Sequence, residues 1–288
     1  MSLPPALTLV VAFVAEMLGY PFMQRAFVAG VCIAVVAPLV GSFLIHRQLA
    51  MIGDTLAHTA FAGVAVGLFL SSLLETPVSP SLTALVVAVV GALLIQTLSE
   101  YTDVYNDVSM VVVLTGGFAV GTILISLTGG GIAVGINQYL FGSLSTITRG
   151  DVELLVALSA LVVAVVLVSY RPLVFVTFDE AAARVGGVDV RWTNRLLVVL
   201  TALVVVGAMQ MLGVILVAAM LVVPVAAATQ VARSFKQSLV LAVVAAQVAV
   251  LAGTTLSYAY GVATGGTIVV VAIGVYAGAV SLTLLGRR

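Results

Sequence analysis

An aspartate and a histidine stand four residues apart in an otherwise apolar stretch of this chain, at Asp54 and His58. Side chains at that spacing share one face of an α-helix. Charged residues make up only 8% of the sequence, and it contains two histidines, so the pair is conspicuous. Ionisable groups inside apolar segments are costly and mark candidate functional sites. A carboxylate oxygen and an imidazole nitrogen together are suitable ligands for a divalent transition metal ion.

The same pair also has a purely structural interpretation, an intrahelical hydrogen bond that satisfies both polar side chains. At about 100° per residue, Phe61 and Ala65 share the face of the pair. The opposite face carries Leu56, Ala60, Gly63 and Gly67. Small residues permit close approach of a neighbouring helix. We therefore expect this helix to pack tightly behind and to present the polar pair toward a cavity or a partner helix.

The depth of the pair depends on how its helix begins. Simple topology places Arg47 at one membrane surface, which would keep Asp54 shallow. A broken or re-entrant helix over residues 50–53 would place the pair deeper. The sequence leaves both arrangements open. In either case a transit site with only two protein ligands would release an ion faster than a closed cage of four.

The composition is that of a helical membrane protein. The chain has 288 residues, 62% of them hydrophobic, and its mean hydropathy is +1.30, far above that of a soluble domain. Apolar runs of about twenty residues recur from end to end. We predict an all-α polytopic protein, a single transmembrane domain over residues 1–288 with eight or nine transmembrane helices. The nine predicted spans are 26–45, 49–71, 80–99, 109–127, 152–170, 194–208, 212–231, 238–258 and 266–286.

The N-terminal segment, residues 1–24, is predicted to be interfacial. Its apolar part, residues 6–20, would be roughly 22 Å long as a helix, which is short for a bilayer, and Pro21 is expected to end it. Orientation follows the positive charges. They gather on one side of the predicted spans, at Arg47, Arg171, Arg184, Arg191, Arg195, Arg233, Lys236, Arg287 and Arg288. That side is expected to be cytoplasmic, with Arg25 and Arg149 as exceptions.

Several functional classes are excluded. A net charge of zero gives no basis for nucleic-acid binding, and the single cysteine, Cys32, excludes a cysteine-based metal site. The only lysine, Lys236, is not part of a phosphate-binding G-x-x-x-x-G-K-[ST] loop, so an ATP-driven system would need a partner ATPase. An intramembrane GxGD protease would need glycine at Met51 and a second intramembrane aspartate. The chain is therefore not predicted to be an enzyme.

The longest polar connection, residues 171–193, is predicted to contain a short cytoplasmic helix. Asp179 is suited to the N-cap, Glu180 to the first turn and Arg184 to the last turn, before Gly186 and Gly187. A helix of about two turns is unstable alone, so something must hold it. It either lies on its own protein or docks on a soluble partner. Phe178 and Val185 would then supply apolar contacts.

Two further features carry weaker hypotheses. Pro224 lies inside a predicted span and is a candidate hinge, although static kinks are more common. Met209, Gln210 and Met211 are predicted to lie in an outer loop, where they could line the access to a transport path.

The chain is similar to the permease subunits of the zinc, manganese and iron ABC importers, the ABC-3 type. The resemblance rests on five stretches in family order: PFMQRA (21–26), RQLAMIGDTLAHTA (47–60), YLFGSL (139–144), FDEAAARVG (178–186) and GVILVAAMLVVP (213–224). The I-G-D-x-x-x-H block within the second stretch is the most specific. His46 departs from the Arg-Arg that often precedes this block, which leaves its role open.

The resemblance implies a multi-pass permease of the plasma membrane that works as a homodimer or with a paired permease. Its other partners would be a dimer of cytoplasmic ABC ATPases and an extracytoplasmic metal-binding protein. Asp54 and His58 fall in the family's intramembrane metal path. The coupling helix that docks on the ATPase corresponds to Phe178, Asp179, Glu180, Ala183, Arg184 and Gly186. No permanently bound cofactor is implied, because the metal ion is the cargo.

The predicted function is therefore the permease of an ATP-driven importer of divalent transition metal ions. Zinc is expected first because it is the commonest cargo assigned in the family, while manganese and iron stay open because the ligand pair suits all three. One alternative is an ATP-driven permease for a metal chelate such as cobalamin or a siderophore, which would arrive already coordinated. Another is an ion-coupled secondary carrier, which would need no docking helix.

Overall fold

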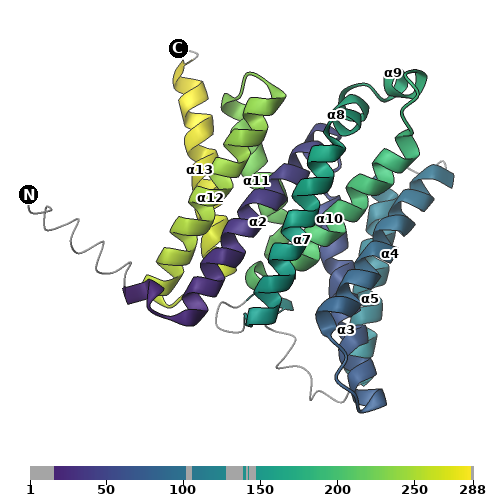
Figure 1. The fold of residues 1–288 in the computed structure, drawn as a ribbon, viewed down its shortest axis with the longest axis vertical. Coiled ribbons are helices and arrows are strands. Elements are labelled where there is room, and N and C mark those ends of the chain that lie inside the picture. Colours follow the sequence, from purple (N-terminus) through teal and green to yellow (C-terminus); the bar gives the residue numbers. More distant parts are fainter. Residues whose placement is uncertain (1–15, 102–105, 128–138, 141, 143–146, 287–288) are drawn as a thin grey trace, which may run out of the picture.

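The computed structural model describes residues 16–101, 106–127, 139–140, 142 and 147–286, and within these ranges there is no β-strand. The helices are α2 (Pro21–His46), α3 (Ile52–Leu74), α4 (Pro80–Tyr101), α5 (Asn106–Leu127), α7 (Arg149–Val168), α8 (Tyr170–Phe178), α9 (Glu180–Val185), α10 (Val190–Leu212), α11 (Val214–Val231), α12 (Phe235–Tyr260) and α13 (Thr264–Gly286). Figure 1 shows α3, α4 and α5 grouped on one side of the bundle and α11, α12 and α13 on the other.

The number of spans agrees with the sequence-based prediction. Among the described residues, eight helices are long and apolar enough to cross a membrane: α2, α3, α4, α5, α7, α10, α12 and α13. The ninth predicted span is α11, which is apolar over the shorter stretch Leu216–Val231. An all-α polytopic membrane protein is thereby confirmed.

The first span begins earlier than predicted, at Pro21 rather than at residue 26. Proline suits the first position of a helix because the N–H that it lacks would have no intrahelical partner there. Residues 21–24, assigned by prediction to the interfacial segment, therefore belong to α2. Residues 16–18 form a helical turn before it, held by a 2.8 Å hydrogen bond from Gln24 Nε2 to the Leu18 carbonyl. The rest of that segment lies outside the described residues.

The prediction of an outer loop around residues 209–211 is wrong. α10 continues to Leu212, and Gly213 alone separates it from α11. Gly213 has φ 83° and ψ 152°, a conformation that glycine adopts without steric cost and other residues do not. Met209 and Met211 are buried, at 0% and 1% exposure. These two methionines pack the core and do not line an outer opening.

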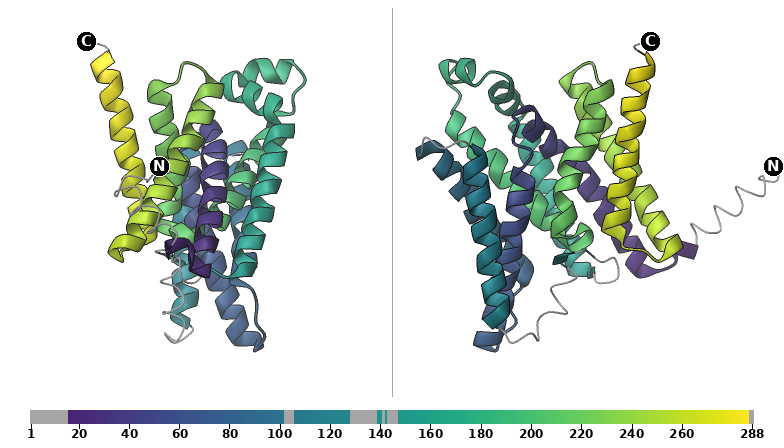
Figure 2. Two further views of the ribbon diagram at one scale, coloured as in Figure 1. Left: turned by 60° about the vertical axis from the view of Figure 1, so that its left-hand side comes forward. Right: turned by 180° about the vertical axis from the view of Figure 1, so that it is seen from behind.

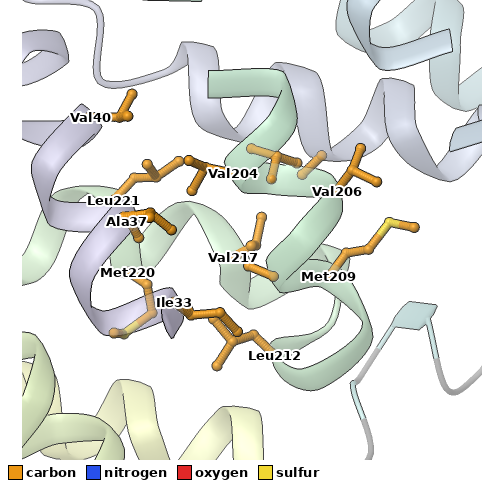
Figure 3. Packing of buried hydrophobic residues seen from close by; sticks show 14 of the residues in the cluster. Ile33, Ala37, Val40, Val204, Val206, Met209, Leu212, Val217, Met220 and Leu221 are labelled. Carbon is orange, nitrogen blue, oxygen red and sulfur yellow. The ribbon is translucent and has the colours of Figure 1, made fainter. Parts of the chain in front are cut away.

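The core lies where α2 packs on α10 and α11. Figure 3 shows Ile33, Ala37 and Val40 of α2 beside side chains of the other two helices. Those side chains, all buried, are Val204, Val206, Met209, Leu212, Val217, Met220 and Leu221. In a bilayer such contacts stabilise through van der Waals packing, because lipid is as apolar as the side chains.

Burial distinguishes central from peripheral helices. In α2, 72% of its apolar 18-residue stretch is buried inside the protein, against 17% of the corresponding stretch in α5 and 11% in α13. α2 therefore lies at the centre of the bundle, and α5 and α13 leave most of their surface to lipid or to another protein. Figure 2 shows α8 and α9 at the same end of the bundle as the α11–α12 connection and the last turn of α13.

Candidate metal site and coupling segment

Asp54 and His58 lie in the first two turns of α3, whose beginning is buried. The chain turns over residues 47–51, where Gln48 has a left-handed φ of 58°. Ile52 and Gly53 then lie inside the bundle. A Cβ atom at Gly53 would be 2.7 Å from Leu221 Cδ1 and 3.7 Å from Ala218 Cα, so this glycine lies directly against α11. α3 therefore begins against α11 instead of at the surface.

Contacts of Thr59, the residue after His58, give the level of the pair. A Cβ atom at Gly91 of α4 would be 2.5 Å from Thr59 Cγ2, and one at Gly117 of α5 would be 3.2 Å from Thr59 Cα. At a rise of 1.5 Å per residue, both glycines lie about 15 Å or more from either end of their helices. His58 is thus near half-height in the bundle, and Asp54 is one turn closer to the end that carries α9.

This depth answers the question that the sequence left open. The pair is deep, yet α3 is a regular helix from Ile52 onward and is not re-entrant. The depth follows from the buried start of α3, which lies below the ends of its neighbours α4 and α5.

The two side chains are close without being hydrogen bonded. His58 Nε2 lies 3.7 Å from Asp54 Oδ1, longer than an N–H···O hydrogen bond. The intrahelical bond of the structural interpretation is therefore not formed. The side chain of Asp54 is 40% exposed and that of His58 is 23% exposed. His58 Nδ1 is buried and has no hydrogen-bond partner among the described residues.

The face of α3 that carries the pair packs against α5, so the expected partner helix is α5. The His58 ring meets Phe118 edge-on, with ring centroids 5.4 Å apart and an interplanar angle of 85°. Phe61 stacks on the same phenylalanine at 5.7 Å and 26°. Sequence reasoning missed Phe118. The available signal was the neighbouring pair Gly117 and Gly121, both of which bring α5 onto α3.

The opposite face of α3 packs tightly on α4, which confirms the prediction from its small residues. A Cβ atom at Gly63 would be 2.5 Å from Ala84 Cα and 2.8 Å from the Thr83 carbonyl oxygen. In contrast, Gly274 and Gly278 of α13 have nothing within 4 Å of a built Cβ. These two glycines, spaced four residues apart, therefore serve no close packing within the described part of the chain.

Among the described residues, no group of three or more His, Cys, Asp or Glu side chains is placed to hold a metal ion. The described part of one chain therefore offers two ligands at Asp54 and His58. Divalent transition metals take four or more. Any additional ligands would come from outside the described part of this chain, for example from water or another molecule.

The predicted cytoplasmic connection is mostly helical, consisting of α8 and α9. The Asp179 carboxylate accepts a 2.8 Å hydrogen bond from the Ala182 N–H, as predicted for an N-cap. Glu180 and Arg184 form an exposed ion pair at 3.0 Å. Gly187, with φ 80°, follows the end of α9. The short helix is confirmed, whereas α8 was not predicted.

The two faces of α9 differ. Val185 is 91% exposed, and Asp179, Glu180 and Arg184 are also exposed. Ala183 is 0% exposed and packs with Val176 of α8 and Val190 of α10. Ala183 therefore holds α9 on its own protein, and its assignment to the coupling segment stays a prediction. Gly186 is exposed but lies beside Phe175.

Phe178 anchors the segment to two other helices. Its ring meets His46 of α2 at a centroid distance of 5.7 Å and Phe235 of α12 at 5.4 Å, and these two rings meet each other at 5.1 Å. His46 Nδ1 lies 2.7 Å from the Ser42 carbonyl oxygen. His46, whose role the sequence left open, is thus part of an aromatic cluster that joins α2, α8 and α12.

Arg47, next in sequence, lies between this cluster and α3. Burial lowers the pKa of its guanidinium, and the nearby Glu180 carboxylate opposes that shift. Its Nη2 atom is buried and has no hydrogen-bond partner among the described residues.

Pro224 is buried in α11, which remains helical from Val214 to Val231. Proline leaves the carbonyl of Met220, four residues earlier, without its intrahelical donor. A hinge at Pro224 stays a prediction.

Comparisons with known proteins agree with this architecture. The model of the ABC 3 transport family matches residues 19–283. The manganese transport system membrane protein MntC of Halalkalibacterium halodurans is 31% identical over 266 residues, which cover 92% of this chain and 88% of that protein. The chelated iron transport system membrane protein YfeD of Yersinia pestis is 31% identical over 260 residues, 90% of this chain and 85% of that protein.

A solved structure, described as PsaBC from Streptococcus pneumoniae in complex with Fab, has a similar fold. The TM-score is 0.82 at 27% sequence identity, and the match covers 94% of this chain and 95% of that one. Because the family model and these relatives match nearly the whole chain and not a single motif, the chain belongs to the ABC 3 transport family.

Proposed function

We propose that this chain is the membrane-spanning permease subunit of an ATP-driven importer of divalent transition metal ions. Family membership and eight apolar helices make it a multi-pass protein of the plasma membrane. The observation that carries the metal assignment is the Asp54–His58 pair, a partly exposed carboxylate and imidazole near half-height in the bundle. Ionisable groups at that depth are expensive and are functional-site candidates.

Manganese is our first choice of cargo, ahead of the zinc expected from sequence. Two similar proteins carry names that refer to manganese and to chelated iron, and neither name refers to zinc. The ligand pair suits manganese, iron and zinc alike. A chelate is the second candidate cargo, since one relative is named for chelated iron. The open coordination positions at Asp54 and His58 favour an ion that arrives without a complete ligand shell.

A second copy of the chain is the proposed source of further ligands. Two copies that face each other with their pairs would offer two carboxylates and two imidazoles. The small buried share of α5, the helix beside the pair, supports an additional protein neighbour there. An extracytoplasmic metal-binding protein and a pair of cytoplasmic ATPases complete the proposed importer. The outward Val185 and charged rim of α9 suit it to dock on the ATPase.

Uptake of radiolabelled manganese, iron and zinc tests the proposal. Cells lacking this chain would be complemented with wild type, Asp54→Ala, His58→Ala or Val185→Asp. The first two variants remove a ligand, and the third places a charge on the exposed apolar contact of α9. Asp107→Ala, an exposed aspartate at the start of α5, is the matched control.

We expect wild type and Asp107→Ala to restore uptake of one metal and the other variants to lose most of it at normal membrane levels. Val185→Asp should also lose co-purification of the ATPase, which Asp54→Ala and His58→Ala should keep. Normal uptake by both ligand variants would make the pair structural and remove the basis of the metal assignment. Uptake of a labelled chelate, but of no free ion, would favour the second candidate.

A further inference from the structure

A cavity of about 460 Å³ lies beneath α9, at the end of the bundle that carries α8 and α9. It is open to one side and is lined by the α2–α3 turn, the last turns of α4, the α8–α9 segment and the first turns of α10. A second cavity of about 520 Å³ continues it, since Glu100, Arg184, Val190 and Arg191 line both. Each of the two cavity volumes is within the range of small-molecule sites, roughly 300–1,000 Å³. The metal pair does not line either cavity.

The second cavity adds one carboxylate, Asp189, which accepts a hydrogen bond from the Trp192 N–H, and the first cavity is lined by three arginines and two glutamates. Its carboxylates, Glu100 and Glu180, are both engaged by arginines. Glu180 pairs with Arg184 at 3.0 Å. Glu100 pairs with Arg195 at 2.9 Å and accepts a 3.1 Å hydrogen bond from Gln96. Two further guanidinium groups line the cavity, Arg47 and Arg191, and neither forms an ion pair within the described part of the chain.

Two buried polar atoms of the lining residues have no hydrogen-bond partner among the described residues. They are Arg47 Nη2 and Asn194 Oδ1, both on side chains that line the cavity. Buried donors of a guanidinium are rarely left unsatisfied. The orientation of an asparagine amide is assigned from its hydrogen bonds, so the Asn194 amide turned by half a revolution would offer a second donor. Arg47, Arg191 and the Asn194 amide would then be three donor groups that line the same cavity.

The Arg47 and Arg191 guanidinium groups, which form no ion pair among the described residues, would repel a divalent cation. They are instead the preferred partners of phosphate oxygens. We infer that the cavity is a binding site for a phosphate-type anion, held by Arg47 and Arg191 with the Asn194 amide. The anion would join the turn that precedes α3 to the first turns of α10, beneath α9.

Two sources supply such an anion at this position. One is a free phosphate ion from the cytoplasm. The other is the headgroup of an anionic phospholipid, since basic pockets between helices at the cytoplasmic side recognise such headgroups. Both present the same phosphate oxygens to Arg47 and Arg191, and binding to the folded chain alone stabilises it. Thermal stability therefore reports binding without any measurement of transport.

The test uses the purified full-length chain in neutral detergent. One series adds inorganic phosphate, with sodium chloride at equal ionic strength as control, because screening alone changes surface electrostatics. A second series adds phosphatidylglycerol to phosphate-free micelles, with phosphatidylcholine as control. Each is run on wild type, Arg47→Gln, Arg191→Gln and Arg233→Gln. Arg233 is exposed at the same end of the bundle and lines neither cavity.

We expect a saturable rise of Tm in wild type and Arg233→Gln, and its loss in Arg47→Gln and Arg191→Gln. A rise with phosphate alone identifies the free ion, a rise with phosphatidylglycerol alone identifies the lipid, and a rise with both shows recognition of the shared phosphate group. The inference is overturned if neither probe exceeds its control, or if the rise persists in both cavity variants. Should Arg47→Gln not fold, the exposed Arg191→Gln decides. None of these outcomes depends on whether the chain carries metal.

Discussion

At the scale of single residues, the chemistry of this chain rests on the separation of Asp54 from His58. At 3.7 Å the carboxylate and the imidazole are too far apart for a hydrogen bond and near enough to share one ion. Phe118 fixes the imidazole edge-on from α5, which limits the orientations of the ring. If the proposed metal site is right, we expect the pair to bind an ion weakly, because most of the coordination shell would be left to other ligands.

A change of ligand type at His58 should alter metal preference. His58→Glu replaces a borderline nitrogen with a hard oxygen, and hard oxygen ligands favour Mn²⁺ over Zn²⁺. We expect the ratio of manganese to zinc uptake to rise several-fold relative to wild type, with lower total uptake. Competition between the two labelled ions in complemented cells measures it. An unchanged ratio at unchanged rates would mean that His58 does not touch the ion.

At the scale of helices, α3 depends on glycine for its close approach to α4. The Gly63 contacts with Ala84 and Thr83 leave no space for a methyl group, whereas Gly274 faces open surface. The same substitution at the two sites therefore separates packing from helix propensity. Alanine favours a helix over glycine by about 1 kcal/mol, and overpacking costs about 1–3 kcal/mol.

We expect Gly63→Ala to lower the Tm of the purified chain and Gly274→Ala to leave it unchanged or slightly higher. Thermal unfolding in one detergent, at one protein concentration, compares the two. Equal effects of both substitutions would show that α4 yields to the added methyl group. Because α4 also meets Thr59 through Gly91, Gly63→Ala should reduce metal uptake as well.

At the scale of the whole molecule, charge is distributed unequally between the two ends. The elements at the end that carries α8 and α9 (Figures 1 and 2) contain, as predicted, Arg47, Arg171, Arg184, Arg191, Arg195, Arg233 and Lys236. Arg287 and Arg288, predicted for the same side, lie outside the described residues. Arg25, one of the two exceptions at the other end, donates to the Ile147 carbonyl at 2.7 Å and to that of Pro21 at 3.2 Å. Arg25 thus has a structural role in joining α2 to the segment before α7.

The positive end should face the cytoplasm. In a Cys32→Ser background, the chain would carry a single cysteine at Glu153→Cys, near the start of α7, or at Val185→Cys in α9. We expect a membrane-impermeant maleimide to label the first in intact cells and the second only after permeabilisation, in cells that express this chain alone. The reverse pattern would invert the orientation and place α9 away from any cytoplasmic ATPase.

The sequence by itself determined the class of the molecule and the identity of its main chemical groups. Apolar runs long enough for a bilayer require helices, since only helices satisfy their own backbone hydrogen bonds in lipid. The spacing of Asp54 and His58 placed both on one face, and Asp179 and Gly187 marked the ends of α9 because capping is local.

Only the tertiary structure decided how deep the Asp54–His58 pair lies, which side chains face inward and which distant residues share a cavity. Asp54 is deep because Gly53 lets α3 begin against α11, and Ala183 faces inward because α8 and α10 lie behind it. The turn at Gly213 was missed because a single glycine with a positive φ joins α10 to α11. No run of polar residues marks such a turn in the sequence. Arg47 and Arg191 meet in one cavity although they are far apart in sequence. Such features depend on contacts between distant segments, which no local pattern of residues encodes.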